Sequence, residues 1–328
     1  MTTSRRVLAL IVASAAMLLG SAGGATAGGP PAPSPATPLP HDGYILLGAD
    51  GGIFNWDLPF NGSPAGSPGS CAPTNGVRTS PVAGGSCLSI ALTPSGDGYW
   101  VMNSLTGLVF GSGDAGLVGT PNDPEHRFQD VSPEFTPQFR QVVATPSGHG
   151  YWVYEVGASD TGIVDPYGDA VSYGDTTKLL QQHVVSGYDG SPVAMAATPD
   201  GNGYWEVYSD GGVFAFGDAH FYGSMAGHWL AAPVVGITST ADGKGYWLVS
   251  REGGVFAFGD ARFSGAVNYN QHPAIVGLAR NPAGPGYWLA SDNGGVYAFG
   301  GAQFFGSVPE FISHLNAPVV AIVAKTGM

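Results

Sequence analysis

The chain has 328 residues, with 24 acidic and 11 basic side chains and a formal net charge of −13. A surface of this sign repels phosphate backbones, which excludes nucleic acid as an expected partner. The 53 glycines and the many apolar residues, beside only 11% charged residues, argue against disorder and favour short strands joined by tight turns.

Residues 1–27 have the order of a cleavable signal peptide. Arg5 and Arg6 precede the apolar run 7–19, and the small residues 25–27 follow as a cleavage site. This run is too short to span a bilayer, and no later stretch reaches the roughly 18 apolar residues that a membrane helix needs. We therefore expect a secreted protein without a membrane contact after cleavage. The export route stays open between the general and the twin-arginine pathways.

Residues 28–40 combine Gly with Pro and contain little that can pack, so they are expected to form a linker. The folded part is then 41–328. That length exceeds the usual size of one compact domain but suits a single ring of repeats.

Two cysteines, Cys71 and Cys87, stand close together in this exported chain. Oxidising conditions outside the cell allow them to form a disulfide, which we predict. A metal site is disfavoured, because two thiols lack the further Cys or His ligands that zinc requires.

An internal repeat is the strongest pattern in the sequence. Its central Tyr-Trp pair recurs every 41 to 55 residues, at positions 99–100, 151–152, 204–205, 246–247 and 287–288, with Tyr44-Ile45 as a degenerate first copy. Each copy is expected to contain four short strands. In the copy at 233–265 these are a small aliphatic strand at 234–238, a strand from Tyr246, the Gly-Val-Phe-Ala-Phe segment, and a last strand of the Phe-Tyr-Gly-Ser type. Four strands in this period are typical of a β-propeller blade.

The two ends of the repeat region complement each other. Residues 43–47 begin directly with a second strand, whereas 318–323 form a first strand with no second strand after it. Pairing of these segments would close a single six-bladed β-propeller and leave no exposed edge. A linear solenoid is the alternative, but it would leave both half-copies as open edges.

The copies at 204–224, 246–266 and 287–307, with the pattern GYW...DGGVFAFGDA.F.GS, resemble the repeats of secreted actinobacterial proteins. The resemblance covers most of 43–328. In such proteins these repeats often accompany cell-wall hydrolases, proteases or esterases and have no assigned chemistry of their own. The resemblance implies an extracellular, cell-wall-associated location rather than a reaction.

Three long insertions, 62–86, 121–139 and 174–190, are expected to emerge on one face of the ring. Binding sites on rigid scaffolds usually lie in such variable loops. We therefore predict a ligand-binding face there, and the alternative is that these are tolerated surface loops. The aromatic candidates for contact with sugar or peptide are Phe128, Phe135, Phe139 and Tyr188.

The repeated Tyr-Trp pairs suggest a carbohydrate platform, but evenly spaced Trp residues inside a blade are interpreted as packing. The recurring Asp of Gly-Asp-Ala, at Asp114, Asp169, Asp218 and Asp260, suggests calcium, but it is interpreted as a turn cap. The sixth copy has Gly301 at this position, and no segment has the ligand spacing of a calcium loop. No metal or cofactor is expected.

Sequence motifs for catalysis are absent. The chain contains neither G-x-S-x-G nor H-E-x-x-H, and its eight histidines are scattered without the spacing of metal ligands. The favoured hypothesis is a non-catalytic binding or scaffold protein, expected to be a monomer, with cell-wall glycan or an extracellular protein as partner. The alternative is an extracellular glycosidase or esterase that uses acidic residues of the loop-rich face, for which paired carboxylates in a pocket would be diagnostic.

Overall fold

The computed structural model describes residues 42–63, 86–121, 138–157, 159–183, 189–267 and 273–325. By its contacts the chain divides into Met1–Leu39 and Pro40–Met328, and all described residues belong to the second unit. The predicted signal peptide and linker lie outside the described residues and stay predictions. No helix in the described ranges has the length and apolarity needed to cross a membrane.

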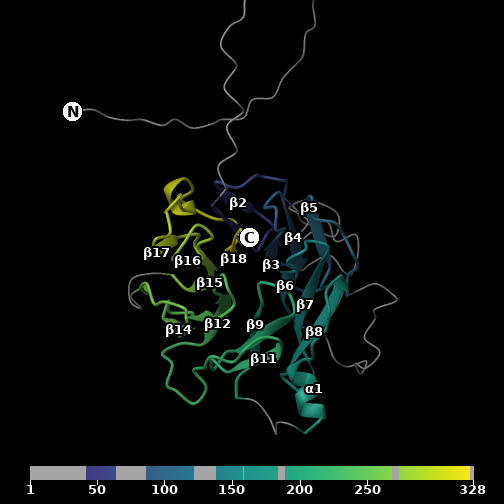
Figure 1. Cartoon of the computed structure of the whole chain (residues 1–328). Coiled ribbons are helices and arrows are strands. Elements are labelled where there is room, and N and C mark those ends of the chain that lie inside the picture. Colours follow the sequence, from purple (N-terminus) through teal and green to yellow (C-terminus); the bar gives the residue numbers. More distant parts are fainter. Residues whose placement is uncertain are drawn as a thin grey trace, which may run out of the picture. The chain divides into compact units, whose positions relative to one another are not determined.

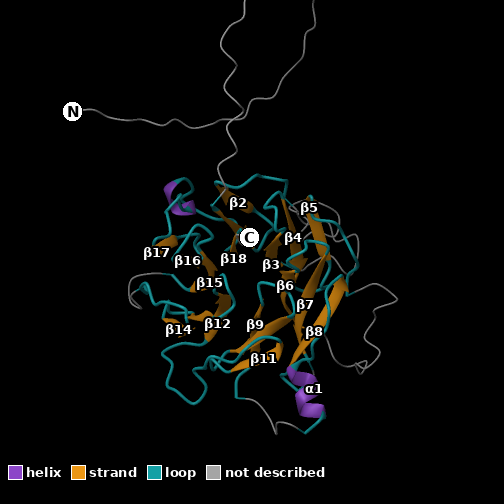
Figure 2. Cartoon of the chain, viewed as in Figure 1, coloured by secondary structure: helices purple, strands orange, loops and turns teal. Residues whose placement is uncertain are grey.

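The described residues form six antiparallel sheets of three strands each, which confirms the all-β prediction. The sheets are numbered here as follows: sheet 1, β18 (Val319–Ala324), β1 (Tyr44–Gly48) and β2 (Ile53–Trp56); sheet 2, β3 (Cys87–Leu92), β4 (Gly98–Asn103) and β5 (Val109–Gly113); sheet 3, β6 (Gln138–Ala144), β7 (Gly150–Val156) and β8 (Gly162–Gly168). The remaining sheets are sheet 4, β9 (Pro192–Ala197), β10 (Gly203–Tyr208) and β11 (Val213–Gly217); sheet 5, β12 (Val234–Ser239), β13 (Gly245–Ser250) and β14 (Val255–Gly259); sheet 6, β15 (Ile275–Arg280), β16 (Gly286–Ser291) and β17 (Val296–Gly300). Figure 2 also shows the short helix α1 (Thr176–Gln181) and the 3-10 turn η1 (Val308–Glu310).

Sheet 1 joins the two ends of the repeat region. Strand β18 pairs with β1, with Tyr44 opposite Ala324 and Leu46 opposite Ile322, as the two incomplete copies predict. The same strand also contacts β3 and β15, the first strands of sheets 2 and 6. First strands of the other consecutive sheets contact each other in the same way. Figure 1 shows these first strands nearer to one another than the third strands of their sheets.

The second strand of every sheet is buried along its whole length, because neighbouring sheets cover both of its faces. In β13, Tyr246 packs with Trp205 of sheet 4, and the adjacent Trp247 packs with Tyr287 of sheet 6. Successive side chains of a strand point to opposite faces, so each Tyr-Trp pair fills two interfaces.

Ring contacts repeat this arrangement in five of the six interfaces between sheets, with centroids 5.3 to 6.0 Å apart in the pairs Trp100–Tyr151, Trp152–Tyr204, Trp205–Tyr246, Trp247–Tyr287 and Trp288–Tyr44. Between sheets 1 and 2, Ile45 takes the place of the tryptophan and packs in a core cluster with Tyr99. All five tryptophans are at most 7% exposed. The interpretation of the Tyr-Trp pairs as packing is therefore confirmed.

The predicted fourth strand of each copy is wrong, since the described sheets have three strands. In sheet 4 the Phe-Tyr-Gly-Ser segment is bound by side chains instead of by a strand. The N–H of Tyr222 donates to the hydroxyl of Tyr246 at 3.2 Å, and that hydroxyl donates to the carbonyl oxygen of Gly223 at 2.5 Å. Just before this segment, Nε1 of Trp205 donates to the carbonyl oxygen of His220 at 2.8 Å. These side chains use backbone groups that a β-ladder would require, and the segment stays irregular.

The predicted disulfide has only one partner within the described residues. Cys87 begins β3 and is fully buried in the interface between sheets 1 and 2. Cys71 lies outside the described residues. The disulfide therefore stays a prediction.

Candidate functional site

One connection of sheet 4 forms a loop that is fixed at both ends. We call residues 226–233 the sheet 4 loop. Before it, the N–H of Met225 donates to the carbonyl oxygen of Gly211 at 2.9 Å. After it, the N–H of Val234 donates to the carbonyl oxygen of Ser209 at 2.9 Å. Both acceptors belong to the turn between β10 and β11. The loop thus stands on a turn of its own sheet, at the end where the insertions were expected.

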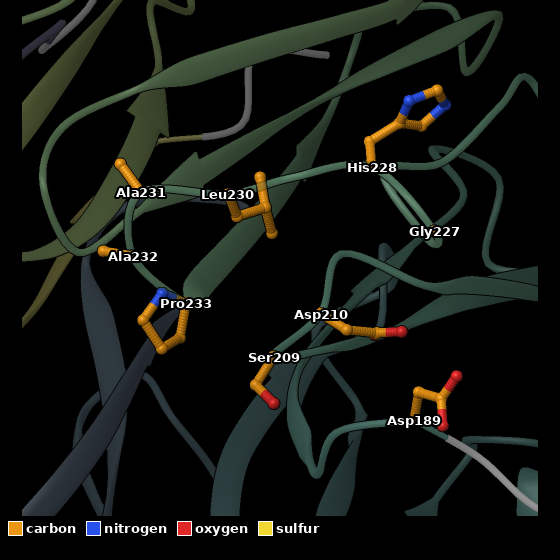
Figure 3. A pocket seen from close by; sticks show the side chains of 9 residues that line it. All are labelled: Asp189, Ser209, Asp210, Gly227, His228, Leu230, Ala231, Ala232 and Pro233. Atoms are coloured by element: carbon orange, nitrogen blue, oxygen red, sulfur yellow. The ribbon is translucent and has the colours of Figure 1, made fainter.

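A depression of about 380 Å³ lies between this loop and the turn below it. Figure 3 shows Asp189 and Asp210 on one side, with the side chain of Leu230 extending from the loop toward the turn. One oxygen of Asp210 accepts from the N–H of Gly212 at 2.9 Å, which holds the turn in shape. The depression therefore combines carboxylates with an apolar wall.

Sheet 6 repeats this construction. Its loop, residues 309–318, is preceded by a bond from the N–H of Val308 to the carbonyl oxygen of Gly294 at 3.0 Å. After the loop, the N–H of Val319 donates to the carbonyl oxygen of Asp292 at 2.8 Å. A depression of about 410 Å³ lies between the loop and the turn. Two sheets therefore present equivalent hollows at the same end of the fold.

Both loops carry large apolar side chains in solvent. Trp229 is 85% exposed on the sheet 4 loop, and Phe311 is 68% exposed on the sheet 6 loop. By contrast, the five tryptophans of the Tyr-Trp pairs are buried. An exposed indole ring on an anchored loop contributes nothing to the core and is available for contact with a partner.

The four aromatic residues predicted for this face have a different outcome. Phe139 lies in β6, is 4% exposed and packs in a core cluster with Trp100 and Val142, so its assignment to ligand binding is wrong. The other three candidates, Phe128, Phe135 and Tyr188, lie outside the described residues. Trp229 was not among the residues predicted for this face. It departs from the repeat because it follows His228 and not a tyrosine, and this departure was the available signal in the sequence.

Glu206 is a buried acid in the middle of β10, at a position that is Leu or Val in the other five sheets. Its side chain is fully buried, and Oε2 accepts hydrogen bonds from Oγ1 of Thr176 at 2.8 Å and from the hydroxyl of Tyr154 at 3.3 Å. Burial raises the pKa of this carboxyl to about 8. Because Thr176 begins α1 and Asp175 caps that helix, the acid fastens part of the insertion 174–190 to sheets 3 and 4.

A second acid, Glu155, lies in β7 and is 1% exposed. Burial, together with the carboxyl of Asp165 on β8, raises the pKa of Glu155 to about 9. A raised pKa is also a property of general acids, so both residues belong among the candidates for chemistry. Their carboxyl groups are enclosed, and a substrate in the depressions described above does not reach them in this structure.

The recurring Asp of Gly-Asp-Ala ties two turns together. Asp114 accepts hydrogen bonds from Oγ1 of Thr93 at 2.8 Å and Oγ of Ser95 at 2.6 Å, and Asp169 is bound by the equivalent Thr and Ser of sheet 3. These carboxylates thus accept from side-chain hydroxyls of the turn between the first two strands, where capping of the backbone was expected. No group of three or more His, Cys, Asp or Glu side chains placed to hold a metal occurs among the residues that the structure describes.

Comparisons with known proteins find likeness to solved structures but not to sequences. No family model matches the chain, and no curated protein matches it. Among solved structures it resembles the β-propeller domain of Cps50 (Swd1) from Myceliophteria thermophila, at 11% sequence identity and a TM-score of 0.41. The likeness covers 86% of this chain and 82% of that one.

Proposed function

We propose that the protein is an extracellular, non-catalytic binding or scaffold protein, built as a six-bladed β-propeller with three-stranded blades. The end that carries the sheet 4 and sheet 6 loops would contact cell-wall glycan or an extracellular protein. The observation that carries this proposal is Trp229, 85% exposed on a loop whose ends are both hydrogen-bonded to its own sheet. The pattern of residues 1–27 and the resemblance to secreted repeat proteins support the location.

Contacts between the first and last copies support a ring. The ring of Trp288 packs against Tyr44 with centroids 5.3 Å apart, as each repeat tryptophan packs against the tyrosine of the next copy. The pairing of β18 with β1 gives sheet 1 the same three-stranded form as the others. Sheet 6 thus contacts sheet 1 as each of sheets 2 to 5 contacts its successor.

The chemistry of the loop end supports binding. An indole ring offers a flat apolar face that packs on the C–H face of a sugar or on an apolar side chain. Anchored loops keep such a ring in place, so that little conformational entropy is lost when a partner binds. The net charge of −13 and the carboxylates of Asp189 and Asp210 favour a neutral or basic partner over an anionic polymer.

The experiment is a pull-down of the purified protein on insoluble peptidoglycan and neutral polysaccharides, with release of reducing ends measured in the same samples. We expect retention without release. Trp229→Ala should weaken retention at least about tenfold, as loss of a central Trp contact does. Phe263→Ala is the matched control, because Phe263 is 61% exposed but lies outside both loops. Retention that does not depend on Trp229 would overturn the assignment of this surface.

A hydrolase is the second candidate, favoured by the pKa values of Glu155 and Glu206, which are raised to about 9 and about 8. The burial of both groups argues against it, because a general acid must come within hydrogen-bond distance of its substrate. Release of reducing ends that Glu155→Gln or Glu206→Gln abolishes would establish the hydrolase and reject the binding protein.

A further inference from the structure

The first strands of all six sheets surround one cavity of about 440 Å³. Each sheet contributes the residue that pairs with its repeat tyrosine: Leu92, Ala144, Ala197, Ser239, Arg280 and Ala324. All six line the cavity. Since they occupy one equivalent position, they form a single layer around it, which we call the mouth layer.

An apolar layer lies two residues earlier on the same strands. It consists of Ile90, Val142, Met195, Ile237, Leu278 and Ile322, all of which line the cavity and are at most 8% exposed. Residues two apart on a strand point to the same side, so the two layers are stacked along the cavity. This layer is therefore apolar and the mouth layer is mostly small, while Gln141, Thr145, Thr198 and Thr238 also line the cavity.

Among the described lining residues of this cavity Arg280 is the only charged one, and none is acidic. Within the described part of the chain no hydrogen bond or ion pair joins its guanidinium to another group. Burial alone lowers the pKa of Arg280, with no nearby carboxylate to offset it. A half-buried cation without a counter-charge is costly, and this cost is relieved when an anion binds.

We propose that the cavity is a binding site for an organic monocarboxylate with an apolar body. The carboxylate pairs with the guanidinium of Arg280 in the two-point geometry that this group offers. The apolar body packs against the layer of Ile90, Val142 and their equivalents. One guanidinium neutralises one carboxylate, whereas a second negative charge on the ligand would have no second cation among the described lining residues.

This site is separate from the loops that carry Trp229. Pro94, Pro146 and Pro199, in turns between first and second strands, border the cavity. The sheet 4 loop stands on a turn between second and third strands, which is at the opposite end of the same sheet. Failure of the glycan pull-down therefore leaves the carboxylate site untouched, and the reverse also holds.

The test is calorimetric titration of the purified protein with octanoate and with its neutral analogue octanamide. We expect octanoate to bind and octanamide to bind at least about tenfold more weakly, the factor that corresponds to a charge-assisted hydrogen bond. Arg280→Gln should reduce octanoate affinity by a similar factor and leave octanamide unchanged. Arg251→Gln removes the same charge from an exposed position outside the cavity lining, and should bind octanoate as the wild type does.

A second variant tests the cavity while Arg280 is kept. Ala144→Leu combined with Ala197→Leu fills the mouth layer with the residue that Leu92 already supplies in sheet 2, so the fold should accept it. This variant should lose affinity for both ligands. Equal binding of octanoate and octanamide, wild-type affinity in Arg280→Gln, or no binding of octanoate by the wild type would each overturn the proposal.

Discussion

The hydroxyl of Tyr44 donates a hydrogen bond to the carbonyl oxygen of Gly306 at 2.5 Å and accepts one from the N–H of the same residue at 3.1 Å. The two residues are 262 positions apart in the sequence. In sheet 5 the equivalent bond, from Tyr246 to Gly223, spans 23 positions. The same local contact therefore joins neighbouring copies in one place and the two ends of the repeat region in another.

Removal of this hydroxyl tests that contact. Tyr44→Phe leaves backbone groups of Gly306 buried without their partner, so we expect a loss of about 1–3 kcal/mol in the free energy of unfolding. Urea denaturation followed by intrinsic fluorescence measures it. Tyr246→Phe is the matched control inside the chain and should lose a comparable amount. A loss in Tyr246→Phe with none in Tyr44→Phe would show that sheets 6 and 1 are not held together in this way.

Two tryptophans with opposite surroundings should respond differently to truncation. Trp205 is fully buried and its Nε1 is hydrogen-bonded, so Trp205→Ala should cost about 3–5 kcal/mol. Trp229 is 85% exposed, so Trp229→Ala should change the free energy of unfolding by no more than about 0.5 kcal/mol. Guanidinium denaturation of both variants provides the comparison, and a large loss in Trp229→Ala would assign that residue to the core.

The pKa of Glu206 predicts that stability falls with rising pH. Burial raises this pKa from 4.5 to about 8, so between these values the unfolded chain ionises while the folded protein keeps its proton. The unfolded state then binds fewer protons, and the contribution of Glu206 declines from pH 4.5 to pH 8 by an amount on the order of a few kcal/mol.

Glu206→Gln isolates this contribution, because the amide does not titrate and its carbonyl oxygen can still accept from Thr176 and Tyr154. Free energies of unfolding at pH 5 and pH 8 should differ less in this variant than in the wild type. A slope remains from Glu155, whose pKa is raised to about 9, and the double variant with Glu155→Gln should be flatter still. An unchanged pH dependence in Glu206→Gln would mean that the carboxyl is ionised in the folded protein.

The glycine that ends strand β14 should tolerate no side chain. Gly259 has a φ of +67°, and a Cβ there would collide with the backbone carbonyl oxygen of Lys244. Gly259→Ala should therefore cost about 2 kcal/mol or more. Gly116 is exposed and a Cβ there meets nothing within 4 Å, so Gly116→Ala serves as the control and should be nearly neutral. Thermal unfolding of the two variants distinguishes them.

The repeat allowed much of the fold to be predicted, since a motif that recurs in every copy must meet the same surroundings in each. The evenly repeated Tyr-Trp pairs predicted packing inside the blades, as Tyr246 and Trp247 show, and the half-copies predicted the pairing of β18 with β1. The prediction of a fourth strand was wrong because Phe221 and Tyr222 are strand-forming residue types. The sequence does not show that the hydroxyl of Tyr246 bonds the backbone of Tyr222 and Gly223.

The candidate sites depend on residues that depart from the repeat. The repeat pattern does not show which of these departures belong to a site. Phe139 was expected in a loop because it is the last residue of the predicted insertion 121–139. In the structure it lies at the bulge near the start of β6 and packs in the core. Arg280 and Glu206 each replace a small or aliphatic residue of other copies. Their meaning appears only when the six equivalent positions are brought together, which is a property of tertiary structure.

The pairing of Tyr44 with Ala324 places the start and the end of the repeat region side by side. A short peptide joining residue 42 to residue 325 would therefore need little length, and new termini could be opened within the sheet 4 loop, where Trp229 is already in solvent. In such a circular permutant the contact of Tyr44 with Gly306 becomes an internal one, and the contact between sheets 4 and 5 becomes the one that brings distant parts of the chain together. The order of the copies along the chain is thus separable from their order in space.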